Sequence, residues 1–211
     1  MSTLSTYKTL LSEELGTSET TFATDTKRVR AINQATRWIG NNYNVPDLQI
    51  EASITFTSGI GTIPTRFLKN ERMMVSSTDS TEFPEYTREE FRNIGRGFTI
   101  GYDTTAAARR VKVKPTTTTS ALWSYFQKPN ASLSADADDS GLPAESDIAV
   151  SKYAAYLILY QKGKLDEAKD MFAGAKEEAR LWANTFEDSD TYITSVYQNT
   201  DYLQGNINSN A

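Results

Sequence analysis

The sequence contains neither cysteine nor histidine. These two absences exclude a Ser-His-Asp triad, a cysteine nucleophile, a thiolate zinc site and a disulfide framework. Catalysis would have to rely on carboxylate pairs, Lys, Tyr, Ser or a hard, oxygen-bound ion such as Mg²⁺ or Ca²⁺. Most familiar enzyme chemistries are therefore excluded, and we expect no cofactor and no metal.

Long hydrophobic runs are also lacking. A membrane helix needs about 20 consecutive apolar residues, and no segment of the 211 residues approaches that length. The N-terminal segment 1–16 is too polar and acidic for a signal peptide. We expect a soluble protein without a membrane partner, made in a cytoplasm. Its formal net charge of −5 gives little general attraction to nucleic acid.

Amphipathic periodicity predicts helices near the N-terminus. Between residues 25 and 43, the side chains of Val29, Ile32 and Ile39 recur at multiples of three and four residues, which places them on one face of a helix. The opposite face of this helix is basic. A shorter helix is predicted over residues 7–15, before a glycine.

The middle of the sequence has strand character. Residues 51–64 alternate apolar and polar side chains and contain a glycine turn, which is typical of a strand and hairpin. Three further strands are predicted over residues 97–103, 109–115 and 121–129. Residues 87–94 predict a short capped helix between them.

The C-terminal third returns to helix. Residues 130–142 are rich in turn formers and predict a loop. Residues 147–160 and 164–187 predict two helices that Gly163 separates, and together they form an antiparallel hairpin. The last segment, 188–211, is polar yet spaced with Tyr, Ile, Val and Leu, so we expect it to dock on a partner.

From these elements we predict an α+β, mainly α fold. Its core would be a helical bundle made of the long N-terminal helix and the C-terminal helical hairpin, with a β-rich insertion and an extended C-terminal tail. The predicted parts are the N-terminal helices (1–45), the β-rich insertion (46–130), the helical hairpin (143–187) and the C-terminal arm (188–211).

One acidic segment has the spacing of a calcium loop. Its candidate oxygen ligands and turn glycine are Asp136, Asp138, Ser140, Gly141 and Asp147. Pro143 stands where an apolar residue normally pairs with a sister loop, and no predicted helix precedes the segment. A solvated acidic loop is therefore the favoured interpretation.

Other chemistries remain as alternatives. A small lytic enzyme needs two carboxylates across a cleft, but the candidate pairs are adjacent in sequence and do not face each other on a helix. These pairs are Glu13 with Glu14, Glu89 with Glu90, and Glu177 with Glu178. Nucleic-acid binding would use basic residues of two segments, 27–37 and 109–114.

The C-terminal hairpin also permits a peptide-binding interpretation. Residues 154–180 look like one unit of a tetratricopeptide repeat, with Gly163 at the turn and Ala168 and Ala175 as small packing positions. No second copy is present, and a single repeat cannot bury its own apolar face. An ordinary hairpin packed on the rest of the protein is favoured over a repeat-like peptide-binding module.

The order of motifs along residues 24–187 adds a resemblance. The motifs are VRAINQATRWI, IPTRFLKNERMMV, GFTIGYD, ALWSYFQKPNASL, LPAESD and GKLDEAKDMF. In this order they resemble the head-to-tail adaptor (head completion or connector) proteins of tailed bacteriophages. The resemblance implies a non-enzymatic virion structural protein, made in the host bacterial cytoplasm and placed at the head-tail interface.

The same resemblance implies the partners. Such proteins form a ring, commonly dodecameric, that docks on the portal protein and contacts a downstream tail protein of the nozzle or tail tube. DNA would pass through the ring without specific binding. The negative charge of the subunits would repel the DNA backbone, so that the DNA slides through. The β-rich region would contact the next tail component.

We expect the functional residues to be interfacial and none to be catalytic. Arg28, Arg30 and Arg37 of the basic helix face are predicted to contact a neighbouring subunit or the portal. The C-terminal arm is predicted to bind the partner through apolar anchors. These anchors are Tyr192, Ile193, Val196, Tyr197, Tyr202 and Leu203.

Overall fold

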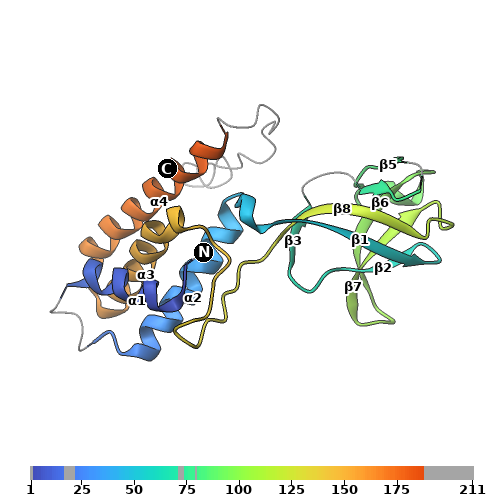
Figure 1. The fold of residues 1–211 in the computed structure, drawn as a ribbon. Coiled ribbons are helices and arrows are strands. Elements are labelled where there is room, and N and C mark those ends of the chain that lie inside the picture. The colour runs from blue at the N-terminus through green and yellow to red at the C-terminus, as the bar shows by residue number, and fades with distance from the viewer. Residues whose placement is uncertain (1, 17–21, 71–73, 79, 188–211) are drawn as a thin grey trace, which may run out of the picture.

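The computed structural model describes residues 2–16, 22–70, 74–78 and 80–187. Two helices come first, the strands follow, and two helices end the described part (Figure 1). The α-helices are α1 (Leu4–Leu15), α2 (Asp25–Asn42), α3 (Asp147–Lys162) and α4 (Leu165–Glu187). The strands are β1 (Gln49–Thr57), β2 (Ile60–Thr62), β3 (Phe67–Asn70), β4 (Met74–Ser76), β5 (Glu82–Phe83), β6 (Gly97–Asp103), β7 (Ala108–Lys114) and β8 (Ser120–Gln127).

The helices predicted from periodicity are confirmed, with their ends fixed by local chemistry. The Thr3 hydroxyl caps α1 by accepting the N–H of Thr6 at 3.4 Å. Helix α3 ends at Gly163, whose φ of 85° lies in the left-handed region that glycine adopts without strain. The Gly163 N–H donates to the carbonyls of Leu159 and Tyr160, and the chain then turns into α4.

The strands form one sheet that nearly closes on itself. Their order is β5-β4-β8-β1-β2-β7-β6, with β3 also paired to β8, and the strand pairs are antiparallel. The first and last strands of this order, β5 and β6, are joined by the residues that directly follow β5. There the N–H of Phe98 donates to Pro84 O at 2.9 Å, and the N–H of Tyr86 donates to Phe98 O at 2.8 Å. The result is an almost closed barrel.

The predicted fold class, a mainly α helical bundle with a β-rich insertion and an extended tail, is therefore wrong. The dominant element is the mostly antiparallel, nearly closed sheet of eight strands, and only four α-helices accompany it within the described residues. Strands β2 to β5 are two to four residues long, too short for an alternating pattern to reveal. The predicted division of the chain into four parts stays a prediction.

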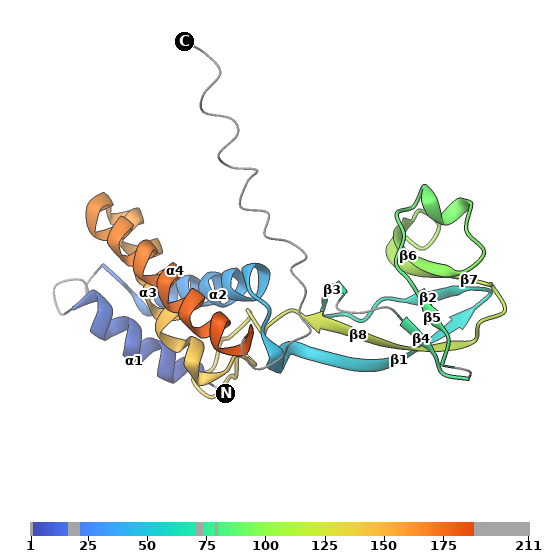
Figure 2. The same cartoon turned by 90° about the horizontal axis from the view of Figure 1, so that it is seen from above.

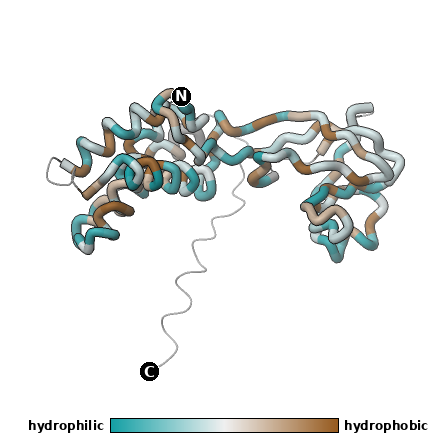
Figure 3. The backbone as a smooth tube through the Cα atoms, turned by 90° about the horizontal axis from the view of Figure 1, so that it is seen from below, coloured by the Kyte–Doolittle hydropathy of each residue, from teal (hydrophilic) through white to brown (hydrophobic). Residues whose placement is uncertain are grey.

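Two separate apolar cores stabilise the molecule. One core lies among the helices and includes Tyr7, Ile32, Leu133 and Ile158, while the other lies in the barrel around Trp123. The barrel core is made of Ile54, Phe56, Phe67, Met74, Phe83, Phe98, Val111, Val113, Ala121, Trp123 and Tyr125. Hydrophobic and hydrophilic residues are interspersed in both parts (Figure 3), as expected for elements that each bury one face.

Strands β1 and β8 join the two parts. They pair from Gln49 opposite Phe126 to Thr55 opposite Ser120. Figures 1 and 2 show these two strands extending from the helices to the barrel, so the molecule is elongated, with helices at one end and the barrel at the other. Such a shape offers two well-separated ends to other proteins.

The segment between β8 and α3 returns along the helices. The N–H groups of Leu4 and Ser5, at the start of α1, donate to the carbonyls of Asp138 and Asp136 at 3.0 and 3.1 Å. These bonds satisfy donors that a helix N-terminus otherwise leaves open.

Over the described ranges, none of the helices combines the length and apolar character needed to cross a membrane.

Candidate partner-binding surfaces

A groove runs along the exposed face of α2. It has a volume of about 640 Å³ and lies between α2 and residues 131–134 of the returning segment. Arg30 and Arg37 line it and are exposed. The groove is also lined by Asp25, Thr26, Val29, Asn33, Gln34, Ala131, Ser132 and Ser134.

Asn33 holds the two walls of this groove together. Its side-chain amide donates to Leu133 O at 3.0 Å, and its amide oxygen accepts the N–H of Leu133 at 2.9 Å. Leu133 is 2% exposed and belongs to the helical core. The position of the groove is therefore fixed by buried packing and by two hydrogen bonds to backbone.

The three predicted contact arginines lie on different sides of α2. Arg30 and Arg37 are seven residues apart, which is two helical turns or about 10 Å on one face. Arg28 points to α1 instead, where its guanidinium donates to Ser12 Oγ at 3.1 Å and its Nε is buried without a hydrogen-bond partner. The structure thus brings Arg30 and Arg37 together and sets Arg28 apart.

The predicted arm anchors cannot be placed. Tyr192, Ile193, Val196, Tyr197, Tyr202 and Leu203 lie outside the described residues. Their role stays a prediction.

A partly exposed aromatic seam crosses α2, α3 and α4, and we define it as Trp38, Tyr153, Tyr156 and Phe172. Trp38 stacks on Tyr153 with ring centroids 4.3 Å apart, and Tyr156 stacks on Phe172 at 5.0 Å. All four side chains are half-buried. Aromatic side chains that stay partly in water are typical of interface anchors. The i, i+3 spacing of the two tyrosines was the available sequence signal for this seam.

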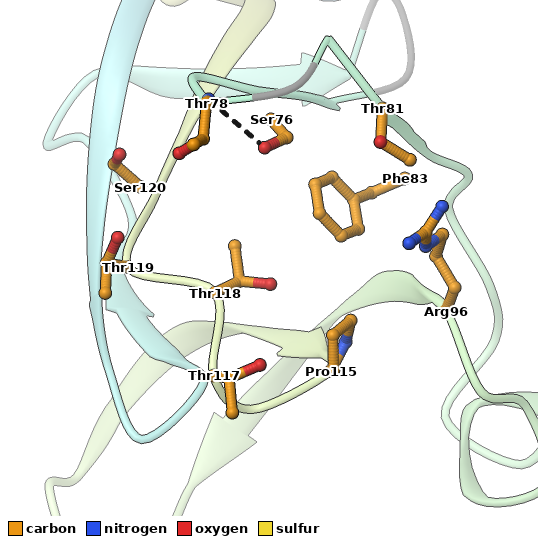
Figure 4. Close-up of a pocket in the computed structure, with 10 residues that line it drawn as sticks. All are labelled: Ser76, Thr78, Thr81, Phe83, Arg96, Pro115, Thr117, Thr118, Thr119 and Ser120. Carbon is orange, nitrogen blue, oxygen red and sulfur yellow. Dashed lines mark hydrogen bonds between the residues drawn. The ribbon is translucent and has the colours of Figure 1, made fainter.

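A small pocket of about 190 Å³ opens at the barrel, between the β4–β5 turn and the β7–β8 loop (Figure 4). The Phe83 ring and the Arg96 guanidinium lie on one side of it, and Thr117, Thr118 and Thr119 face them from the other side. Its lining is completed by Ser76, Thr78, Thr81, Pro115 and Ser120. Hydroxyl groups and one cation can bind polar groups, but the pocket provides no general base beside a nucleophile.

The acidic segment that resembled a calcium loop uses its carboxylates internally. Asp138 Oδ2 accepts the N–H groups of Ser134 and Ala135 at 2.7 and 2.8 Å, and these bonds lower the pKa of Asp138. Asp136 pairs with Lys8 at 2.8 Å. Within the described ranges, no group of three or more acidic residues is arranged to hold a metal ion.

A buried polar cluster lies under α1. The Ser2 hydroxyl donates to Asp147 Oδ2 at 2.7 Å, and the hydroxyls of Tyr7 and Ser140 are 2.9 Å apart. Burial raises the pKa of Tyr7 and also the pKa of Asp147. All four residues are buried inside the helical part, so the cluster presents no open site.

Three glutamates of the candidate pairs are engaged in local contacts. Glu177 pairs with Arg180 at 2.9 Å and Glu178 with Lys152 at 2.8 Å. Glu90 accepts the hydroxyl and the N–H of Thr87 at 2.7 and 3.0 Å, which forms a capping box. These contacts give no support to a cleft with two opposed carboxylates.

The comparisons with known proteins fit surfaces of this kind. The sequence model of one family, described as SU10 adaptor protein, matches residues 2–206. A search of curated proteins found no match. Since the family match covers nearly the whole chain, the protein belongs to the SU10 adaptor protein family of phage head-tail adaptors, which implies a structural component of a bacteriophage virion.

Proposed function

We propose that this protein is a non-enzymatic virion protein that assembles into a ring, docks on the portal protein, and connects the capsid vertex to the tail. The observation that carries this proposal is the elongated, two-ended shape (Figure 2), with separate cores in the helices and in the barrel. A connector needs two faces for two neighbours. Each end of this molecule has its own core to hold such a face rigid.

The α2 groove supports a contact with the portal or with a neighbouring subunit. No carboxylate among the described residues forms a salt bridge with Arg30 or Arg37. Both guanidiniums are exposed along a rigid helix face. Arginine forms bidentate hydrogen bonds with carboxylates, so an acidic segment of the partner fits this groove best.

The aromatic seam supports packing between copies. Its four rings bridge α2, α3 and α4, and Lys176 Nζ lies 4.3 Å from the centroid of the Phe172 ring. Aromatic residues contribute most of the binding free energy at many interfaces. A ring repeats the same contact at every subunit, and a dodecamer would form one such seam contact per copy.

The C-terminal arm and the net charge complete the proposal. The arm, residues 188–211, would bind the portal through the six anchors predicted from its sequence. A formal charge of −5 on each copy would repeat around the ring. A negative passage repels the DNA backbone and lets DNA move through without specific binding.

The test is a binding experiment between the full-length protein and purified portal rings of candidate phages. We expect Arg30→Glu and Arg37→Glu each to weaken binding, because each change replaces an attraction by a repulsion. Lys128→Glu is the control, since Lys128 is exposed and lies outside the groove lining. Portal binding that is unchanged in both arginine variants would overturn the role of the groove, and no binding to any portal would overturn the function.

A further inference from the structure

One edge of the barrel is open along part of β6. On one side, β6 pairs with β7 over its full length, from Gly97 opposite Lys114 to Asp103 opposite Ala108. On its other side, the chain after β5 reaches only Phe98, through the hydrogen bonds of Phe98 to Pro84 and Tyr86. The barrel closes at this single position.

The backbone groups of Ile100 and Tyr102 face the same side as those of Phe98. In an extended strand, the N–H and C=O groups of successive residues point to opposite edges, so residues 98, 100 and 102 share one edge. Since Phe98 uses that edge to bind residues 84–86, the groups of Ile100 and Tyr102 point away from β7.

A capping box explains why the neighbouring chain does not continue along this edge. Directly after Tyr86, Thr87 and Glu90 exchange three hydrogen bonds of 2.7, 3.0 and 3.3 Å. This arrangement ends the extended segment in a short 3₁₀ turn, Glu90–Arg92, which contacts β6 near its first residue, where Lys114 opposite Gly97 donates to Arg92 O at 3.0 Å. Among the described residues, no strand covers the edge at Ile100 and Tyr102.

The β6–β7 hairpin that carries the open edge is basic and carries an exposed aromatic residue. Tyr102 is 55% exposed and lies directly opposite Arg109 on β7. Lys112 follows on the same strand, while Arg110 donates to the Thr62 hydroxyl on β2. The one acid of the hairpin, Asp103, already accepts the N–H groups of Thr105 and Ala106. Tyr and Arg are among the residues enriched at binding hot spots.

We propose that the open edge of β6 at Ile100 and Tyr102 binds an extended, acidic segment of a partner protein by β-strand addition. The incoming backbone would complete the hydrogen bonds of the two residues. Its acidic side chains would meet Arg109 and Lys112 of the adjacent strand β7. The same two cations repel the basic hairpin of a second copy, which selects an acidic partner over self-association.

The proposal goes beyond the adaptor function and does not depend on ring formation or portal docking. Its test measures amide hydrogen exchange in the full-length protein, alone and with a synthetic peptide that alternates Val with Glu. A peptide that alternates Val with Lys and a short DNA duplex are the comparison probes. We expect the Val-Glu peptide alone to slow exchange at Ile100 and Tyr102, while Thr99 and Gly101, which face β7, stay unchanged.

Two variants make the test specific. Tyr102→Pro removes the edge N–H without breaking a bond to β7, and we expect it to weaken binding of the Val-Glu peptide about tenfold. Should this variant fail to fold, the double variant Arg109→Glu and Lys112→Glu tests the charge requirement, with Lys128→Glu as the control. Equal protection by the Val-Glu and Val-Lys peptides, protection by DNA, or no protection by the Val-Glu peptide would overturn the proposal.

Discussion

Asn33 on α2 and Leu133 after β8 are 100 residues apart in sequence and exchange two hydrogen bonds. Between them, the chain leaves the helices, builds the whole barrel and returns. The two bonds fasten the return segment to α2 and form a wall of the groove that Arg30 and Arg37 line. The Asn33 side chain thus holds the return segment against α2 and fixes the shape of the candidate interface.

The first prediction concerns this amide. Asn33→Ala leaves the N–H and C=O of Leu133 without partners at a nearly buried position, so we expect a loss of about 2 kcal/mol in the free energy of unfolding. Asn42→Ala is the matched control, because Asn42 bonds to Trp38 O at an exposed site. Urea unfolding followed by circular dichroism measures both. Equal effects of the two substitutions would contradict the role assigned to Asn33.

The second prediction concerns Gly40, where α2 meets the end of β8. A Cβ atom there would lie 2.4 Å from Cδ of Pro129, which is too close and belongs to a rigid ring. Gly40→Ala should therefore destabilise the protein by about 1–3 kcal/mol, although the same change usually stabilises a helix. Gly174→Ala on α4 is the control.

At Gly174 a Cβ would meet only the flexible Lys152 side chain, at 3.3 Å. We expect Gly174→Ala to be neutral or stabilising by up to about 1 kcal/mol. Thermal melting of the two alanine variants distinguishes the sites. A stabilised Gly40→Ala variant would show that Pro129 does not pack against α2 as described.

The third prediction is a pH dependence at Asp147, which is 8% exposed. Burial raises its pKa, an effect that hydrogen bonds from Ser2 and Tyr7 only partly offset. A raised pKa in the folded state means that the contribution of this carboxyl to stability is fully present below about pH 3.9, its unfolded pKa. The contribution is then lost as the pH rises through the folded pKa.

Asp147→Asn removes this loss, because the amide does not ionise. The difference in free energy of unfolding, variant minus wild type, should therefore be larger at pH 7 than at pH 3. Urea titrations at a series of pH values measure the difference. If the two proteins show parallel pH profiles, Asp147 does not carry the burial penalty.

The fourth prediction follows from the two cores. Ile158 is buried in the helical core and Val111 in the barrel core. Ile158→Ala should cost about 2–5 kcal/mol and speed amide exchange in α2 and α3, while leaving the amides of β7 and β8 protected. Val111→Ala should show the reverse pattern. Exchange that rises in both parts with either variant would mean that the cores unfold as one unit.

Periodicity predicted the long elements well. The apolar stripe of α2, the glycine turn between α3 and α4, and the strands at β6, β7 and β8 are all present where the pattern indicated them. Each of these signals is local, because it depends on residues one to four positions apart. A short capped helix was predicted over residues 87–94. The cap is present, as a capping box of Thr87 and Glu90, but only a 3₁₀ turn follows it.

The closure of the barrel could not be predicted in this way. It depends on Phe98 bonding to Pro84 and Tyr86 and on β strands as short as Glu82–Phe83. Such pairings join segments whose registers local patterns do not specify. The candidate interface was likewise predicted in part, since the basic face of α2 was clear, but the inward turn of Arg28 to Ser12 depends on how α1 packs.

The measurement that tests the central claim most directly is the mass of the assembly. Full-length protein and a chain ending at Asp188 are each mixed with purified portal rings and weighed by native mass spectrometry, after circular dichroism has shown that both are folded. The account predicts that the full-length protein joins the portal in ring stoichiometry and that the shortened chain does not. A full-length protein that stays a 23.5 kDa monomer beside every portal tested would contradict it.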